Sequence, residues 1–296
     1  MNTATFMKPE QLIPLNLNLR AKMIVEGMIA GIHKSPYHGF SAEFLEYRGY
    51  LNGESTRKID WRKFAKSDKT VVKLFEDETN LFATILVDKS ASMKFSSGSF
   101  ISRFEYARTL AAALAWILIG QRDAVGFASF DEQFATFIPP HSTNSQLKNI
   151  LGTLEKIEPG AQTRCANAID TLARVIEKRG LSIIISDFFD EPSEIIQALR
   201  HLRFKRQDII VLWVLDPFEI EFSSRSSYQL HDLETGKTLT LDGITASEYF
   251  KNGLLEHREK IEHACRELQI DCDLIITSEP FQKALLRVLE KRRKLY

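Results

Sequence analysis

The chain has 296 residues, of which 44% are hydrophobic, so it can bury one large core or two smaller ones. Its 39 basic and 39 acidic residues balance, which disfavours attraction of the whole chain to nucleic acid or to a membrane surface. The 3 cysteines have neither CxxC pairing nor metal-like spacing, which predicts buried thiols in a reducing compartment. Because there is no signal sequence and no apolar run of about 18 residues, we expect a cytoplasmic chain without a membrane span.

The first 80 residues show no regular alternation of strands and helices. Residues 12–32 carry Leu, Met and Ile at helical spacing, and we expect residues 1–36 to form an N-terminal helical segment. Residues 37–80 are basic, aromatic and strand-like. We expect them to be an extension packed on the core, because so few strands are not stable alone and their aromatic side chains need burial.

Strand-like and helix-like segments alternate from residue 81 onward, and we assign residues 81–296 to one α/β domain. The expected strands cover residues 81–87, 124–130, 134–138, 181–185, 209–215 and 274–277. The expected helices cover residues 110–119, 144–157, 166–177, 193–202 and 248–268, and a last helix begins near Pro280. Continuous apolar strands separated by helices predict a mostly parallel central sheet with helices on both faces. Residues 218–243 are a polar insertion, in which two alternating arms predict a β-hairpin over residues 228–241.

Oxygen-bearing side chains follow the first of these strands. Asp88, Ser90 and Ser92 come directly after residues 81–87, in the pattern Asp-x-Ser-x-Ser. A carboxylate and two hydroxyls on one tight loop are hard oxygen ligands, which suit Mg²⁺ or Mn²⁺. Open α/β sheets bind ligands outside the carboxyl ends of their strands, where this loop is expected. The alternative is that these side chains cap the following helix by accepting backbone N–H bonds.

Two further loops offer oxygen ligands at strand ends. Thr163 lies just before the helix that starts near Cys165, and Asp187 follows the apolar strand 181–185. Together the three loops resemble the metal-ion-dependent adhesion site of von Willebrand factor A-like domains, which uses Asp-x-Ser-x-Ser, a Thr from a second loop and an Asp from a third. The resemblance implies that the ion is held by Asp88, Ser90, Ser92, Thr163 and Asp187. It also implies that a partner protein supplies one more carboxylate.

The segment before the α/β domain narrows the resemblance. Residues 47–53 (YRGYLNG), 57–62 (RKIDWR) and 72–78 (VKLFEDE) look like the signature that precedes the A-like domain in bacterial proteins of the domain of unknown function 58 family. The likeness covers most of the chain from about Tyr37, and the RKIDW block is its most specific part. Membership implies frequent pairing with a MoxR-type AAA+ ATPase, in systems that assemble or remodel other proteins.

These observations favour a metal-dependent protein–protein interaction module over an enzyme. No nucleophile elbow, phosphate-binding glycine loop or HExxH motif is present in the sequence. The alternative is a metal-dependent nuclease or phosphohydrolase that uses Asp60, Glu76 or Glu78 as extra ligands. Residues 57–73 carry seven basic and two acidic side chains, for which a solvated or docking surface is favoured over nucleic-acid binding.

Overall fold

The computed structural model describes residues 6–33, 44–49, 64, 70–75, 81–98, 100–160, 162–221, 228–231, 238–241 and 243–295. The chain divides into two compact units. The smaller unit is Ile32–Asn80, and the larger unit comprises Met1–Gly31 and Leu81–Tyr296. Within the described part of the chain, no helix is both long and apolar enough to cross a membrane.

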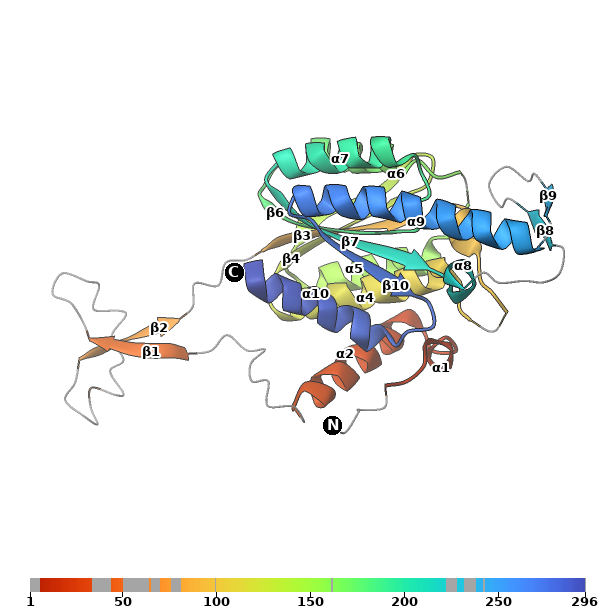
Figure 1. Cartoon of the computed structure of the whole chain (residues 1–296). Coiled ribbons are helices and arrows are strands. Elements are labelled where there is room, and N and C mark those ends of the chain that lie inside the picture. The colour runs from red at the N-terminus through yellow and green to blue at the C-terminus, as the bar shows by residue number, and fades with distance from the viewer. Residues whose placement is uncertain are drawn as a thin grey trace. The chain divides into compact units, whose positions relative to one another are not determined.

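A six-stranded sheet forms the centre of the larger unit, with the strand order β10-β7-β6-β3-β4-β5 (Figure 1). Its strands are β3 (Phe82–Asp88), β4 (Ala124–Phe130), β5 (Phe134–His141), β6 (Gly180–Ser186), β7 (Gln207–Leu215) and β10 (Asp271–Ile276). All neighbours pair in parallel except β4 and β5, which are antiparallel. The expected α/β class with a mostly parallel sheet is therefore confirmed.

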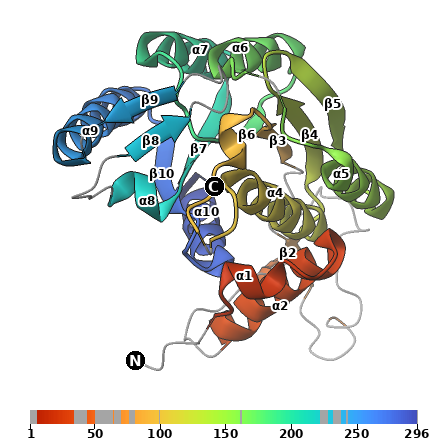
Figure 2. The same ribbon diagram turned by 90° about the vertical axis from the view of Figure 1, so that its right-hand side faces the viewer.

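Helices cover both faces of this sheet, as Figure 2 shows. One face carries α4 (Arg103–Gly120), α5 (Asn144–Lys156) and α10 (Phe281–Leu295), and the other carries α6 (Cys165–Val175), α7 (Pro192–Phe204) and α9 (Gly243–Glu267). The strands β4 and β6 are buried along their whole length, as expected for parallel strands covered on both sides. Helix α4 presents a run of buried alanines, which lets its backbone approach the sheet closely.

The core between the sheet and α6, α7 and α9 brings distant segments together. Leu86 and Phe130 from the sheet pack in one cluster with Leu199 of α7 and Ile261 of α9. Trp213 of β7 belongs to the same cluster and is almost fully buried. This cluster fixes the strand ends that carry the oxygen-bearing loops.

The N-terminal residues form two helices, α1 (Pro9–Leu12) and α2 (Leu17–His33), where the sequence predicted one helical segment. Arg20 of α2 is buried and donates hydrogen bonds to Thr109 of α4 and to the carbonyl oxygens of Ile13 and Leu15. It also forms an ion pair with Glu105 of α4. These contacts attach the N-terminal helices to the larger unit.

Strand β5 is longer than expected. The sequence predicted an end before Pro139, but the strand continues through both prolines to His141. Proline lacks the N–H that a central strand needs, and it is tolerated here because β5 is the edge of the sheet, with one neighbour only. Strand β10 begins at Asp271 rather than at residue 274, because pairing with β7 extends over polar residues that the apolar pattern did not include.

Two small antiparallel pairs lie outside the main sheet. In the insertion, β8 (Tyr228–His231) pairs with β9 (Thr238–Leu241), which confirms the predicted hairpin. In the smaller unit, β1 (Phe44–Gly49) pairs with β2 (Val71–Phe75). The packing of residues 37–80 on the core stays a prediction.

The strand order has a switch point between β3 and β6. After β3 the chain moves to β4 and β5 on one side, and then returns to place β6, β7 and β10 on the other side of β3. At such a switch point the connections leave in opposite directions, and open α/β sheets bind ligands at the carboxyl ends of the strands there. Asp88 ends β3 and Asp187 directly follows β6, so the fold itself brings these two carboxylates to that end of the sheet.

The close approach of β3 and β6 requires a glycine at the start of β6. A Cβ atom on Gly180 would lie 2.1 Å from the backbone oxygen of Phe82, so Gly180→Ala should lower the free energy of unfolding by about 1–3 kcal/mol. Gly152→Ala in α5 is the matched control, because its Cβ meets nothing within 4 Å and alanine favours a helix by about 0.5–1 kcal/mol. Urea denaturation of both variants measures the two effects. Equal stability of the two variants would contradict this close approach.

Candidate metal site

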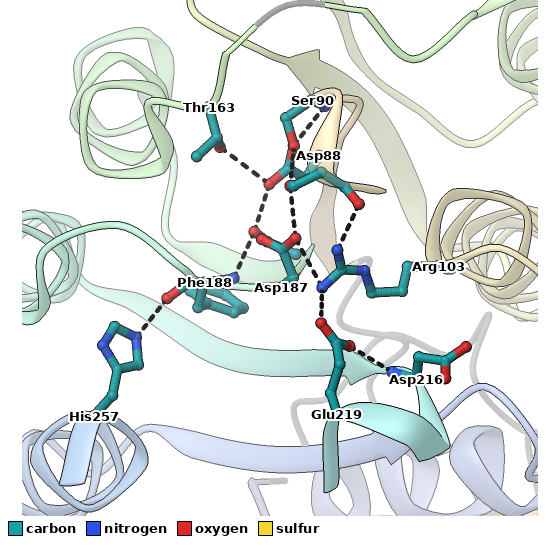
Figure 3. Close-up of polar contacts among 11 residues, drawn as sticks. Asp88, Ser90, Arg103, Thr163, Asp187, Phe188, Asp216, Glu219 and His257 are labelled. Carbon is teal, nitrogen blue, oxygen red and sulfur yellow. Dashed lines mark hydrogen bonds and ion pairs between the residues drawn. The ribbon is translucent and has the colours of Figure 1, made fainter. Parts of the chain in front are cut away.

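The first loop of the site is built on the end of β3. The Oδ1 atom of Asp88 accepts a hydrogen bond from the backbone N–H of Ser90 at 2.8 Å, which folds the loop back over the strand end. The hydroxyls of Ser90 and Ser92 lie 3.0 Å apart. Asp88 and Ser90 have no exposed surface, so the oxygen atoms of this loop are buried among the residues that surround them (Figure 3).

The second and third loops approach from neighbouring elements. The Thr163 hydroxyl lies 3.4 Å from Asp88 Oδ2 and donates to it. Ser186, the last residue of β6, donates a hydrogen bond of 2.5 Å to the same oxygen. The hydroxyl of Ser92 donates to Asp187 Oδ2 at 2.7 Å. The structure thus brings the predicted residues to one edge of the sheet, and adds Ser186 to them.

The donor set fits a divalent cation. Asp187 Oδ1 is buried and has no hydrogen-bond partner among the described residues, although a buried carboxylate oxygen normally has one. Two buried aspartates and the hydroxyls around them are the hard oxygen ligands of Mg²⁺ or Mn²⁺. No group of three or more His, Cys, Asp or Glu side chains suited to a metal occurs in the described ranges, so any ion here depends on the hydroxyls.

Burial, and after it the nearby charge of Asp187, raise the pKa of Asp88 to about 7, against hydrogen bonds from Ser186 and Ser90 that lower it. Its surroundings therefore disfavour the ionised form of Asp88 when no cation is present. A divalent ion between the two carboxylates would favour that form and would compete with the proton on Asp88.

A buried guanidinium occupies the other side of Asp187. Arg103 Nη1 lies 3.2 Å from Asp187 Oδ2 and donates to Glu219 Oε1 at 2.8 Å, while Nη2 donates to the carbonyl oxygen of Ser92. Glu219 belongs to the short helix α8 (Pro217–Ile220), and its Oε2 accepts from the backbone N–H of Asp216 at 2.8 Å. Burial raises the pKa of Glu219 to about 7, and the charge of Arg103 opposes that shift.

The Asp187 loop is held in a strained conformation by α9. Phe188 has a φ of 50°, which is unfavourable for a bulky side chain. His257 of α9 lies 2.7 Å from the Phe188 carbonyl oxygen, and its ring packs edge-on against Trp213. The backbone N–H of Phe188 donates to the Ser186 hydroxyl at 3.0 Å. These contacts orient the peptide that carries Asp187.

The capping alternative is wrong for the helix that follows the first loop. Helix α4 has Ser102 as its N-cap residue, whose side chain accepts from the backbone N–H of Glu105 at 3.2 Å. The short 3₁₀ helix η2 (Ser92–Lys94) begins after Ala91, without a side-chain cap. The first loop is therefore free of a capping role toward either helix.

Sequence reasoning did not find Ser186, Arg103, Glu219 or His257. Ser186 could have been found, since it is a polar residue at the same strand end as Asp187. Arg103 and His257 carry no local signal, because they lie on helices and reach the site only through tertiary contacts. The candidate hydrolase ligands Asp60, Glu76 and Glu78, and residues 57–63 and 65–69 of the basic stretch, lie outside the described residues.

The family described as "Protein of unknown function DUF58" matches residues 46–260. The chain belongs to this family. An uncharacterized protein of Mycobacterium tuberculosis is 25% identical to this DUF58 chain over 283 residues, which cover 94% of this chain and 88% of the relative. A second uncharacterized protein, from Mycobacterium avium, is 27% identical over 161 residues, which cover 52% of this chain and 90% of the relative.

Solved structures similar to this DUF58 chain include the conserved hypothetical protein BatB from Bacteroides thetaiotaomicron and the VWA domain of SpRpn10. BatB is 18% identical, with a TM-score of 0.48 over 72% of this chain and 99% of the BatB chain. The SpRpn10 VWA domain is 12% identical, with a TM-score of 0.42 over 70% of this chain and 94% of that domain.

The role of His257 can be tested by removing its hydrogen bond. His257→Leu leaves the carbonyl oxygen of the strained Phe188 without its donor, and should cost about 1–2 kcal/mol of unfolding free energy. Amide hydrogen exchange should accelerate across residues 187–190. His263→Leu on the same helix is the matched control, because that side chain is 66% exposed and its ion-pair contact to Glu267 is 3.8 Å long. Unchanged exchange in His257→Leu would mean that α9 does not hold the loop.

Proposed function

We propose that this DUF58 chain is a protein-interaction module that binds a divalent cation at Asp88, Ser90, Ser92, Thr163 and Asp187 and presents it to a partner. One observation supports this above all. Two buried carboxylates and several hydroxyls converge at the switch point of the sheet, and one carboxylate oxygen there has no partner among the described residues. A bound divalent cation would be the largest local charge at this end of the sheet, and would attract a carboxylate from the partner.

An interaction role agrees better with this ligand set than hydrolysis does. Two-metal hydrolases surround their ions with several carboxylates, so that attacking and leaving oxygens are both stabilised. In the five-residue set proposed here, hydroxyls outnumber carboxylates by three to two. We therefore propose a binding module without catalytic activity.

The family resemblance suggests the class of partner. The resemblance implies frequent pairing with a MoxR-type AAA+ ATPase, and we propose such an ATPase, or a protein that it remodels, as the partner. The partner would contribute an exposed Glu or Asp to the cation. Ser90 and Asp88 are the side chains whose loss should weaken such a contact most directly, since neither alanine variant introduces a replacement cation.

Metal binding is tested by calorimetry with Mg²⁺ and Mn²⁺. Wild type should bind either ion, and Asp88→Ala should not, while thermal unfolding shows that the variant is folded. Affinity should fall as the pH decreases through about 7, because the raised pKa of Asp88 lets a proton compete with the ion. Asp170→Ala, in the part of α6 that pairs with His201, is the matched control and should bind like wild type. Equal affinity in wild type and Asp88→Ala would rule out this site.

Partner capture is tested by co-purification in magnesium-containing buffer. A tagged wild-type chain should retain the MoxR-type ATPase, and EDTA, Asp88→Ala or Ser90→Ala should each reduce its recovery about tenfold or more, because the partner's carboxylate loses its anchor. Ser193→Ala on the exposed start of α7 is the matched serine control. Recovery that is insensitive to EDTA and to both variants would place the interface elsewhere. Cleavage of nucleic acid or a phosphate ester that these variants abolish would favour the hydrolase alternative.

A further inference from the structure

Arg103 is a buried cation in an unfavourable position. It is the first residue of α4, where the helix dipole is positive and disfavours a cation, and only 3% of its surface is exposed. Its Nε atom has no hydrogen-bond partner among the described residues. Burial removes the hydration of the guanidinium, so its charge must be stabilised by negative charges and hydrogen-bond acceptors nearby.

Residues of the proposed metal site and of α8 supply the groups that stabilise this charge. The guanidinium contacts Asp187 and Glu219 through Nη1, and the Ser92 carbonyl oxygen through Nη2 (Figure 3). Its central carbon lies 5.5 Å from the ring centre of Phe95 and 5.4 Å from that of Phe189. The guanidinium therefore contacts two aromatic rings as well as the oxygen atoms, and moving it away from Asp187 would break several of these contacts.

The two oxygens of Asp187 thus have different roles. Oδ2 is shared by the Ser92 hydroxyl and Arg103, whereas Oδ1 is without a partner among the described residues. A cation that binds through Asp187 shares one carboxylate with the guanidinium, and the two positive charges repel each other at short range in a buried setting. Glu219 partly offsets that repulsion, because its carboxylate lies 2.8 Å from the same Nη1 atom and carries the opposite charge.

We infer that Arg103 is the residue that sets the metal affinity of this site: it acts as an internal counter-cation at Asp187, and Glu219 moderates its effect. This inference rests on the proposed metal site. It predicts opposite effects for two neighbouring charges, which a purely structural role would not produce. Removing Arg103 should tighten cation binding, and removing the charge of Glu219 should weaken it.

The test is calorimetric titration of the full chain with Mg²⁺, and with Mn²⁺ as a second probe, at about pH 8, where carboxylates with a pKa near 7 are ionised. Arg103→Met keeps the length and apolar contacts of the side chain and should bind about tenfold or more tightly than wild type. Glu219→Gln keeps the shape and should bind about tenfold or more weakly. The double variant removes one positive and one negative charge and so leaves the net charge around Asp187 unchanged; it should lie between the two.

Arg108→Met is the matched control, because Arg108 lies on the same helix, is largely buried and pairs with Glu105 rather than with the site. It should bind the metal like wild type. If Arg103→Met does not fold, the double variant takes its place, and it should bind more tightly than Glu219→Gln.

Two other outcomes separate the inference from the proposed function. Equal affinity of wild type, Arg103→Met and Glu219→Gln would overturn the inference and leave the metal site standing. Absence of binding in all of these proteins would overturn the metal site, and the inference with it.

Discussion

Two carboxylates at the carboxyl ends of β3 and β6 are the constraint on which the rest of the site depends. Asp88 and Asp187 are fully buried, and they lie where the strand order reverses. Like charges in such a place repel each other, and burial together with the charge of Asp187 raises the pKa of Asp88. The pair destabilises the folded chain unless positive charge or hydrogen-bond donors surround it. The neighbouring contacts offset the charge of these two buried carboxylates.

Hydroxyl groups offset part of the negative charge of the two carboxylates. Ser186 and Thr163 donate to Asp88, and Ser92 donates to Asp187, so that each carboxylate is stabilised by neutral groups that can also serve as hard ligands. Arg103 supplies the only full positive charge that the described contacts place on Asp187. In the described contacts, neutral donors and one guanidinium thus offset the negative charge of the two buried carboxylates.

The loop that carries Asp187 also contacts α9, which covers the face of the sheet opposite to α4. Phe188 follows Asp187 directly, packs its ring against Trp213 at 5.9 Å between centroids, and has its carbonyl oxygen held by His257 of α9. Phe189, the next residue, is 39% exposed and stacks on Arg103. The peptide that carries a proposed ligand is thus positioned by helices from both sides, α4 through Arg103 and α9 through His257. These contacts from two helices are a physical reason for the loop to be rigid. Phe189 nevertheless remains partly exposed.

The sequence by itself determined the parallel sheet, the hairpin and the loops that follow β3 and β6. Those features depend on local periodicity and on residues next to strand ends, such as Asp88 and Asp187, which can be recognised without a structure. Strand bounds were less predictable, because β5 tolerates prolines only as an edge strand. Only the tertiary structure decided which remote side chains meet at the site. Arg103 and Glu219, which form an ion pair, are 116 residues apart, and His257 is 69 residues from Phe188, whose carbonyl oxygen it contacts. No local pattern encodes such contacts, because they arise when the strand order and helix packing bring remote side chains to one site.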